Sequence, residues 1–410
     1  MPKFLDGIVV LDFSRVLAGP FCTMTLADLG ARVIKVESPD GDEARGMGPF
    51  VDGNSLYFAG INRSKESIVL HLKTPQGVKL ARRLCQKCDV LVENYRPGTM
   101  DKLGLGYDDV RKLNPSIVYA SLSGFGHSGP YRDRGAYDVI IQAMSGLMSV
   151  TGSDGGRPTR VGASIGDLIP ALYTATAILA ALNVRDRRGG CHLDIGMMDC
   201  LVSVMENALS RYWVTGEDPK PLGNRHPAIA PFSSFAVDDG EVVIACGNDV
   251  LWARLCGALG APDLARDPRF VSNSLRTENA TELAVELETA LAGHKMSECL
   301  ELLSGAGIPC AKINSTSDLM NDPNLHARNM IVEIDQPGIG PMPAPGTPIK
   351  ADGFDDDVRN PAPRLGAHTR EVLSQLLDVD SEELARLERS GAIGQAATHG
   401  RQSHLRNKCD

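Results

Sequence analysis

Short apolar runs alternate with helical patterns along the first two hundred residues of the chain. Runs rich in β-branched residues predict strands, and apolar positions that recur every three or four residues predict helices. The predicted strands are 8–13, 33–37, 67–72, 90–94, 117–123 and 191–195, and the predicted helices are 20–29, 75–88, 168–185 and 197–215. Such alternation predicts an α/β fold whose mostly parallel sheet is covered by helices.

The alternation of predicted strands and helices changes after a connector rich in Pro and Gly at 216–223. Asp239-Gly240 between two apolar runs is a strong hairpin signal, so strands are expected at 233–237 and 241–245. Helical patterns follow at 249–259, 279–293 and 296–304. This second pattern predicts a smaller α+β domain.

We therefore expect a large domain whose first part is 1–216 and a small domain at 225–328. A linker and C-terminal part at 329–393 would return to the large domain. Within that part, 336–353 is expected to be extended, while 368–377 and 381–389 are expected to be helices. The segment 394–410 is a polar tail.

Composition limits the kinds of function. The 410 residues carry a net charge of −9, which argues against a broad nucleic-acid surface. Ten scattered cysteines and the lack of a signal-peptide pattern are typical of a cytoplasmic protein with reduced thiols. Cys85 and Cys88 are the one close pair, and packing rather than metal binding is expected for them because zinc needs about four ligands. The apolar stretch 161–183 is too polar for a membrane span.

Known nucleotide motifs do not fit. The segment Gly124–Gly129 matches G-x-G-x-x-G and follows a strand, but Pro130 comes next and no helix opens there. Because the dinucleotide fingerprint needs its third glycine at a helix start, NAD binding is not expected. Cations follow several strands, Lys73 and Arg96 among them, and would suit a polyphosphate ligand at the carboxyl edge of a sheet.

Asp167 stands where a glycine-rich segment leads into the apolar run 168–183. On residue type and position alone, it is a helix N-cap more often than a nucleophile. His226 follows the connector at 216–223 in a polar context, and it is the histidine most suited to face a cleft. The residues by themselves leave the role of Asp167 open.

Ten ordered motifs resemble the class III coenzyme A transferases, the family of formyl-CoA transferase and carnitine CoA-transferase. The resemblance covers about residues 4 to 393. Its motifs are Leu5–Phe13, Val16–Pro20, Leu29–Glu37, Gly41–Arg45, Asn62–Lys65, Val92–Gly98, Gly104–Tyr107, Ser123–Pro130, Gly166–Asp167 and Leu365–Thr369.

The resemblance implies a Rossmann-like large domain, an interlocked homodimer and coenzyme A as co-substrate, without a permanently bound cofactor or metal. It makes Asp167 the catalytic residue, which forms aspartyl anhydride and aspartyl-CoA thioester intermediates. The CoA contacts that it implies are Val16, Ala18, Leu70, Lys73, Asn94, Tyr95, Arg96, Lys102, Gly135, Ala136, Tyr137 and Asp138. Arg45 or His226 would hold the second carboxylate of a dicarboxylic substrate.

The resemblance leaves three functions to weigh. The first is CoA transfer from an acyl-CoA, with succinyl-CoA as the suggested donor, to a carboxylic acid. The second is an α-methylacyl-CoA racemase, which needs a His where this chain has Tyr137, and a phenol with a pKa of about 10 is a poor proton shuttle. The third is a CoA-binding protein without catalysis, which the presence of Asp167 disfavours. Ser38 stands where formyl-CoA transferase has Arg, so formyl-CoA and oxalate are not the expected pair.

Overall fold

The computed structural model describes residues 3–358 and 360–394 and divides the chain into two compact units. Unit 1 comprises 1–145, 162–206 and 323–410, and unit 2 comprises 146–161 and 207–322. The expected boundaries differ from this division, since 146–161 and 207–216 belong to unit 2. The expected polar tail lies outside the described residues, apart from Gly394.

Unit 1 is built on a six-stranded sheet in which every pairing is parallel. Its order is β5-β2-β1-β6-β7-β8, which is the doubly wound order of Rossmann folds. The strands are β1 (Val9–Asp12), β2 (Arg32–Glu37), β5 (Lys65–Val69), β6 (Val90–Glu93), β7 (Val118–Ser123) and β8 (Cys191–Gly196). The predicted α/β class is confirmed.

Alternating residues of each strand enter two different cores. Val10 and Val33 belong to one core, while their neighbours Leu11 and Ile34 belong to the other. This alternation explains why successive residues of a strand can both be apolar, because a strand covered on both faces needs no polar side.

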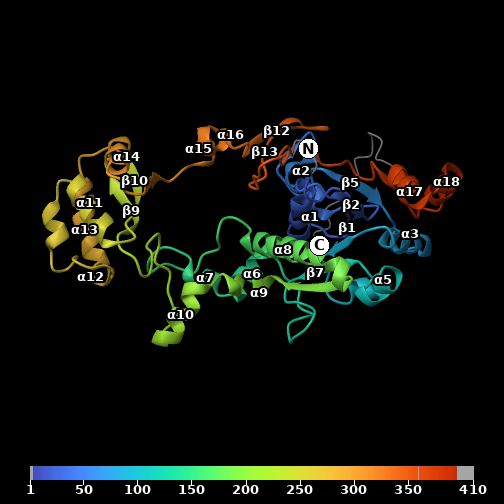
Figure 1. The fold of residues 1–410 in the computed structure, drawn as a ribbon, viewed down its shortest axis with the longest axis horizontal. Helices are drawn as coiled ribbons and strands as arrows, with labels where there is room; N and C mark the ends of the chain where they lie inside the picture. The colour runs from blue at the N-terminus through green and yellow to red at the C-terminus, as the bar shows by residue number, and fades with distance from the viewer. Residues whose placement is uncertain (1–2, 359, 395–410) are drawn as a thin grey trace, which may run out of the picture. The chain divides into compact units, whose positions relative to one another are not determined.

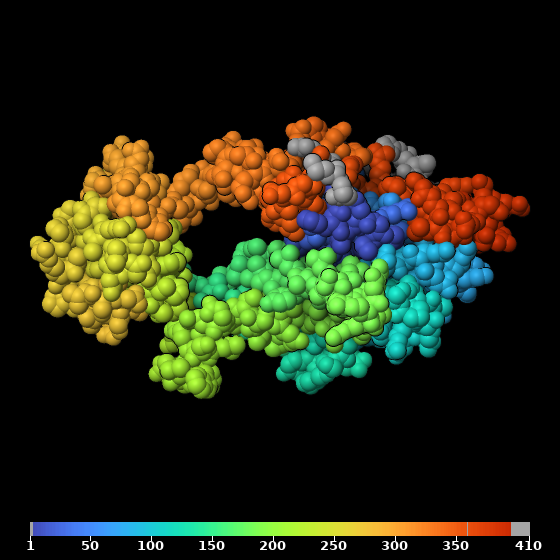
Figure 2. All heavy atoms as spheres, viewed as in Figure 1, coloured from blue at the N-terminus to red at the C-terminus, as the bar shows by residue number. Residues whose placement is uncertain are grey.

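Helices cover the two faces of this sheet (Figure 1). One core contains residues of α1 (Ala18–Asp28) and α8 (Ile165–Arg188). The other contains residues of α3 (Pro75–Cys85), α5 (Tyr107–Leu113), α17 (Thr369–Leu377) and α18 (Ser381–Arg389). In Figure 2 the red C-terminal segment lies against the blue part of the same unit, so the chain does return to the large unit.

Shorter elements complete unit 1. The helices are α2 (Leu56–Ile61), α4 (Thr99–Lys102), α6 (Asp138–Met144), α9 (Met197–Ser203) and α16 (Pro323–Ala327), with a 3₁₀ turn at Glu43–Gly46. Two antiparallel pairs are β3 (Phe50–Val51) with β4 (Asn54–Ser55), and β12 (Ile331–Gln336) with β13 (Gly340–Pro345).

Unit 2 holds a three-stranded antiparallel sheet in the order β11-β10-β9. The strands β9 (Phe232–Val237) and β10 (Gly240–Ala245) form the predicted hairpin, and β11 (Cys310–Lys312) was not predicted. The helices are α7 (Leu147–Val150), most of α10 (Glu206–Thr215), α11 (Asp249–Ala258), α12 (Asn273–Glu278), α13 (Ala280–Leu291), α14 (Met296–Gly305) and α15 (Thr316–Met320), with a 3₁₀ turn at Pro262–Arg266.

One predicted helix was wrong in detail. The single helix expected at 197–215 is α9 and α10, and the break falls where the chain passes from unit 1 to unit 2. The segment 336–353 was expected to be extended, and it contains the strand β13. Its three prolines project outward while Met342 and Ala344 are buried, an arrangement that a two-stranded edge permits because proline lacks an amide donor.

The helix α8 is the one described helix that is long and apolar enough to cross a membrane. Ala171, Ala175 and Ile178 on one of its faces are buried in a core shared with the sheet, as in the core helix of a globular protein. On its other side, Leu172 and Tyr173 are exposed.

Removing one partner of a buried ion pair is expected to destabilise unit 1 more than the same change in an exposed pair. The guanidinium of Arg63 donates twice to Asp28, at 3.0 and 2.5 Å, and once to the carbonyl of Pro345 at 2.6 Å. Arg63→Met would leave the buried Asp28 carboxylate without its partner, so a loss of about 3–5 kcal/mol is expected. Urea unfolding followed by circular dichroism measures it.

Arg32→Met is the matched control. Arg32 and Glu66 are joined at 3.0 Å, but both side chains are about one third exposed, so a loss under about 1 kcal/mol is expected. Equal losses in the two variants would contradict the role given to burial.

Candidate active site

The strand order brings two loops together at one edge of the sheet. The strands β1 and β6 are neighbours, yet their connections run to opposite sides of the sheet, so a crevice opens beyond their carboxyl ends. A cavity of about 200 Å³ lies there. Its lining residues are Arg15, Val16, Leu17, Ala18, Glu43, Asn94, Tyr95, Arg96, Pro97, Leu122, Ser123, Gly124, Arg134, Gly135, Ala136, Tyr137, Asp167 and Met197.

Asp167 lies in the first turn of α8 and lines this cavity. The helix begins at Ile165 with Ser164 as its N-cap, so Asp167 is not the cap residue. The amide of Asp167 donates to the Ser164 carbonyl at 2.9 Å. The positive end of the helix dipole favours a carboxylate in this turn.

Asp138 and Gln142 hold the backbone next to Asp167. The Asp138 carboxylate accepts hydrogen bonds from the Gly166 amide at 2.8 Å and from the Gln142 side chain at 2.9 Å. A Cβ on Gly166 would lie 2.8 Å from the Asp138 carbonyl oxygen, so only glycine fits. Asp138 was expected to contact CoA, but it is buried and does not line the cavity.

Val16 has a backbone conformation that is unusual for a β-branched residue, with φ at 66°. Its amide donates to Asp42 at 3.0 Å, and Lys35 lies 2.8 Å from the other oxygen of the Asp42 carboxylate. Lys35 also donates to the Ser14 carbonyl at 2.9 Å. The surroundings therefore fix a strained turn at the edge of the cavity.

The Asn94 side chain joins the two loops that follow β1 and β6. It accepts from the Arg15 amide at 2.9 Å and donates to the Arg15 carbonyl at 2.8 Å. The Arg15 guanidinium lies 5.0 Å from the centre of the Tyr95 ring and 2.6 Å from Glu43. Arg96 extends toward Gly135, where a Cβ would come within 2.7 Å of its guanidinium.

Several predicted binding residues lie outside the cavity. Leu70 is buried in the core, whereas Lys73 and Lys102 are exposed beyond the carboxyl ends of β5 and β6. Arg45 donates twice to the buried Glu37, each time at 2.7 Å, and lies over the Phe58 ring. His226 belongs to unit 2, where its ring accepts from the Ala228 amide at 3.1 Å. The roles predicted for Arg45 and His226 stay predictions.

Tyr57 is a residue that the sequence reasoning missed. It comes from α2, and burial followed by the nearby carboxylates of Asp167, Asp42 and Asp138 raises its pKa to about 12. A neutral phenol close to Asp167 is a hydrogen-bond donor at neutral pH. No pattern marks an isolated tyrosine in a six-residue helix, so the sequence held no signal for it.

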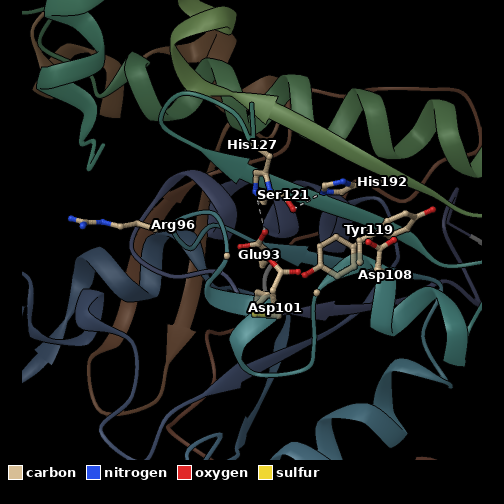
Figure 3. Close-up of a pocket in the computed structure, with 12 residues that line it drawn as sticks. Glu93, Arg96, Asp101, Asp108, Tyr119, Ser121, His127 and His192 are labelled. Atoms are coloured by element: carbon tan, nitrogen blue, oxygen red, sulfur yellow. Dashed lines mark hydrogen bonds and ion pairs between the residues drawn. The ribbon is translucent and has the colours of Figure 1, made fainter. Parts of the chain in front are cut away.

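A second cavity of about 130 Å³ also has Arg96 in its lining (Figure 3). It contains the buried carboxyl group of Glu93, which lies 3.8 Å from His127, and Ser121 lies 2.9 Å from His192. Burial raises the pKa of Glu93 to about 7. Burial, followed by His127, lowers the pKa of His192.

Among residues 3–358 and 360–394, no group of three or more His, Cys, Asp or Glu side chains could hold a metal ion. Cys85 and Cys88 are both buried in the core, as expected of packing residues.

Comparison with known proteins identifies the class of this chain. The model of CoA-transferase family III matches residues 5–369, and the chain belongs to that family. It is thus a CoA-transferase, with coenzyme A as co-substrate.

The individual relatives carry related names. The chain is 44% identical to an acetyl-CoA:oxalate CoA-transferase of Acetobacter aceti, over 88% of this chain and 92% of that protein. It is 39% identical to a succinyl-CoA:glutarate CoA-transferase of Mus musculus, over 97% and 92% of the two chains. A crystal structure of a CAIB/BAIF family protein from Brucella suis matches with a TM-score of 0.81 and 40% identity, over 92% and 100% of the two chains.

The close fit between Asp138 and Gly166 predicts the effect of one added methyl group. Gly166→Ala should displace the first turn of α8 and lower the kcat of CoA transfer about tenfold or more, because a misplaced reacting group loses its alignment. The matched control is Gly162→Ala, whose Cβ would meet nothing within 4 Å. Steady-state kinetics on both variants, with melting temperatures to compare folding, measures the difference. Equal kcat values would contradict the positioning role.

Proposed function

We propose that this enzyme moves CoA from succinyl-CoA to a small dicarboxylic acid and that Asp167 carries the acyl group covalently. The observation that carries this proposal is the place of Asp167 in a cavity walled by the residues expected to bind CoA. The names of the relatives, several of which pair succinyl-CoA with glutarate or mesaconate, support the choice of substrates.

The shape and charge of the site suit an extended, anionic thioester. Arg15, Arg96 and Arg134 line the cavity, and Lys73 lies along the same edge of the sheet. Guanidinium and ammonium groups are the usual partners of phosphates. The pantetheine arm would run between the loops after β1 and β6 and bring the thioester to Asp167.

The reaction would proceed in four exchanges at carbonyl carbons. An oxygen of Asp167 attacks the thioester carbon, the carbon–sulfur bond breaks, and CoA leaves as a thiolate. The thiolate then attacks the Asp167 carbonyl of the anhydride and releases succinate, which leaves an aspartyl-CoA thioester. The acceptor carboxylate displaces CoA to form a second anhydride. Finally, the thiolate attacks the acceptor's carbonyl, and Asp167 leaves as a carboxylate.

No observation favours the racemase over the transferase. Tyr137 stands where a racemase needs histidine, and its side chain is exposed. A protein that binds CoA without catalysis would have no need of a carboxylate in the cavity.

The homodimer and the cytoplasmic location stay predictions. The exposed face of α8, with Leu172 and Tyr173, is apolar enough to be covered by a second copy of the chain.

Covalent catalysis predicts a specific oxygen transfer. If the acceptor acid carries oxygen-18 in its carboxylates, one labelled oxygen should enter Asp167 at each turnover, because the bridging oxygen of the second anhydride comes from the acceptor. Hydroxylamine added with succinyl-CoA should convert Asp167 to a hydroxamate. Mass spectrometry of the peptide detects both changes.

Asp167→Asn keeps the size of the side chain but removes the nucleophile, so CoA transfer should fall at least about 10³-fold. Asp199→Asn is the control, since Asp199 lies in the first turn of α9 and does not line the cavity. If an acyl-CoA exchanges its α-proton in deuterium oxide and Asp167 acquires no label, the result would support the racemase instead. Binding of CoA with neither reaction would support the non-catalytic protein.

A further inference from the structure

The segment Asn94–Pro97 separates two cavities. One side faces the cavity that contains Asp167, and Arg96 also contributes to the lining of the cavity around Glu93. Figure 3 shows Glu93 and His127 pointing toward each other, while the Arg96 side chain points away from them. The group behind this wall is therefore a buried acid next to an imidazole.

Glu93 supports the wall directly. It is the last residue of β6, and its carboxyl group accepts a hydrogen bond from the Tyr95 amide at 2.8 Å. Only 2% of the residue is exposed. From the other side, the Asn94 side chain binds both backbone groups of Arg15. The wall is thus held at two points, and of the two only Glu93 can change its charge.

We propose that Glu93 is a positioning residue whose carboxyl group, which faces His127, sets the place of the Asn94–Pro97 wall, and that protonation of this carboxyl group changes the setting. The inference rests on the proposed function in one respect, namely that this wall binds the CoA part of the substrate.

The groups around Glu93 come from every element that packs against it. They are Tyr119 and Ser121 of β7, His127 after β7, His192 and Asp194 of β8, Asp101 of α4, and Tyr107 and Asp108 of α5. Burial, Asp101 and Asp194 oppose a negative charge on Glu93, and burial is the largest of these effects. The hydrogen bonds from Ser121 and the Tyr95 amide favour the charge, and the His127 ring lies 3.8 Å from the carboxyl group.

These opposing effects give Glu93 a pKa of about 7, so its charge changes near neutral pH. A carboxylate accepts a hydrogen bond about twice as strongly as a neutral group does. The Tyr95 amide should therefore be held more firmly above pH 7 than below it. The KM for acyl-CoA should therefore fall as the pH rises. The kcat depends on Asp167, so it should change only weakly with the position of the Asn94–Pro97 wall.

The test compares KM and kcat of the full-length enzyme with succinyl-CoA and glutarate between pH 6 and pH 8.5. In the unaltered enzyme, KM for succinyl-CoA should fall threefold or more as the pH rises. In Glu93→Gln, which mimics the protonated acid, KM should stay near the high value from pH 7 to pH 8.5, above the range in which the phosphates of CoA titrate, with kcat within about twofold. His127→Gln should move the midpoint to higher pH, because it removes a partner of the charged acid.

Glu66→Gln is the control, since Glu66 lies on β5 in a partly exposed ion pair. It should keep the profile of the unaltered enzyme. The phosphate groups of CoA titrate near pH 6, and their effect would persist in Glu93→Gln.

A pH profile in Glu93→Gln equal to that of the unaltered enzyme overturns the proposal, as does a KM that does not change with pH. If Glu93→Gln fails to fold, as judged by circular dichroism, His127→Gln decides, and an unmoved midpoint overturns the proposal. A failure of the proposed function is distinguishable, because Asp167 then acquires no label. A failure of this inference leaves the labelling of Asp167 intact.

Discussion

The reversal of direction between β1 and β6 is the constraint on which the site depends. In a doubly wound sheet the connections leave these two strands toward opposite faces, so neither loop covers the end of its neighbour. The loop after β1 begins α1 at Ala18, and the loop after β6 leads to α4. Both loops are short, and both line the cavity, the first with 15–18 and the second with 94–97. The two-sided cores of the sheet make this arrangement rigid, because any shift of a strand would disturb packing on both faces.

Charges buried beneath the first loop fix its shape. Asp12 is inaccessible and accepts hydrogen bonds from Ser14, Thr23 and Lys65. Burial is the largest effect and opposes its ionisation, yet Lys65, Lys35 and the hydrogen bonds from Ser14 and Thr23 together hold the pKa of Asp12 below its ordinary value. Burial also lowers the pKa of Lys65 to about 8. A buried ion pair is weak support for stability by itself, but each partner fixes the geometry of the other. In this protein, that geometry holds the strained turn at Val16.

The sequence predicted the sheet because its strands are read from short-range patterns. Val33–Glu37 and Val90–Asn94 were placed to within a residue, since strands buried on both faces are rich in β-branched and other apolar residues. The site was harder to predict from such patterns. Residue type and position alone favoured a helix cap for Asp167, and only the resemblance to the motifs of a family indicated a nucleophile. The contact of Asp138 with the Gly166 amide and the approach of Tyr57 join residues far apart in the chain. No local pattern encodes such contacts.

The choice of an aspartate fits a reaction between two acids. In the proposed mechanism, Asp167 must attack a thioester as a nucleophile and later depart from an anhydride as a leaving group. The ordinary pKa of an aspartate side chain, about 3.9, is close to that of small carboxylic acids. The two carboxylates joined in each anhydride are therefore of similar basicity, and neither direction of cleavage is strongly uphill. A serine or cysteine would hold the acyl group as an ester or thioester and could not itself become a CoA thioester. Because the aspartyl carbon can accept the CoA thiolate, the thioester bond energy is kept on the enzyme while one acid leaves and the other enters.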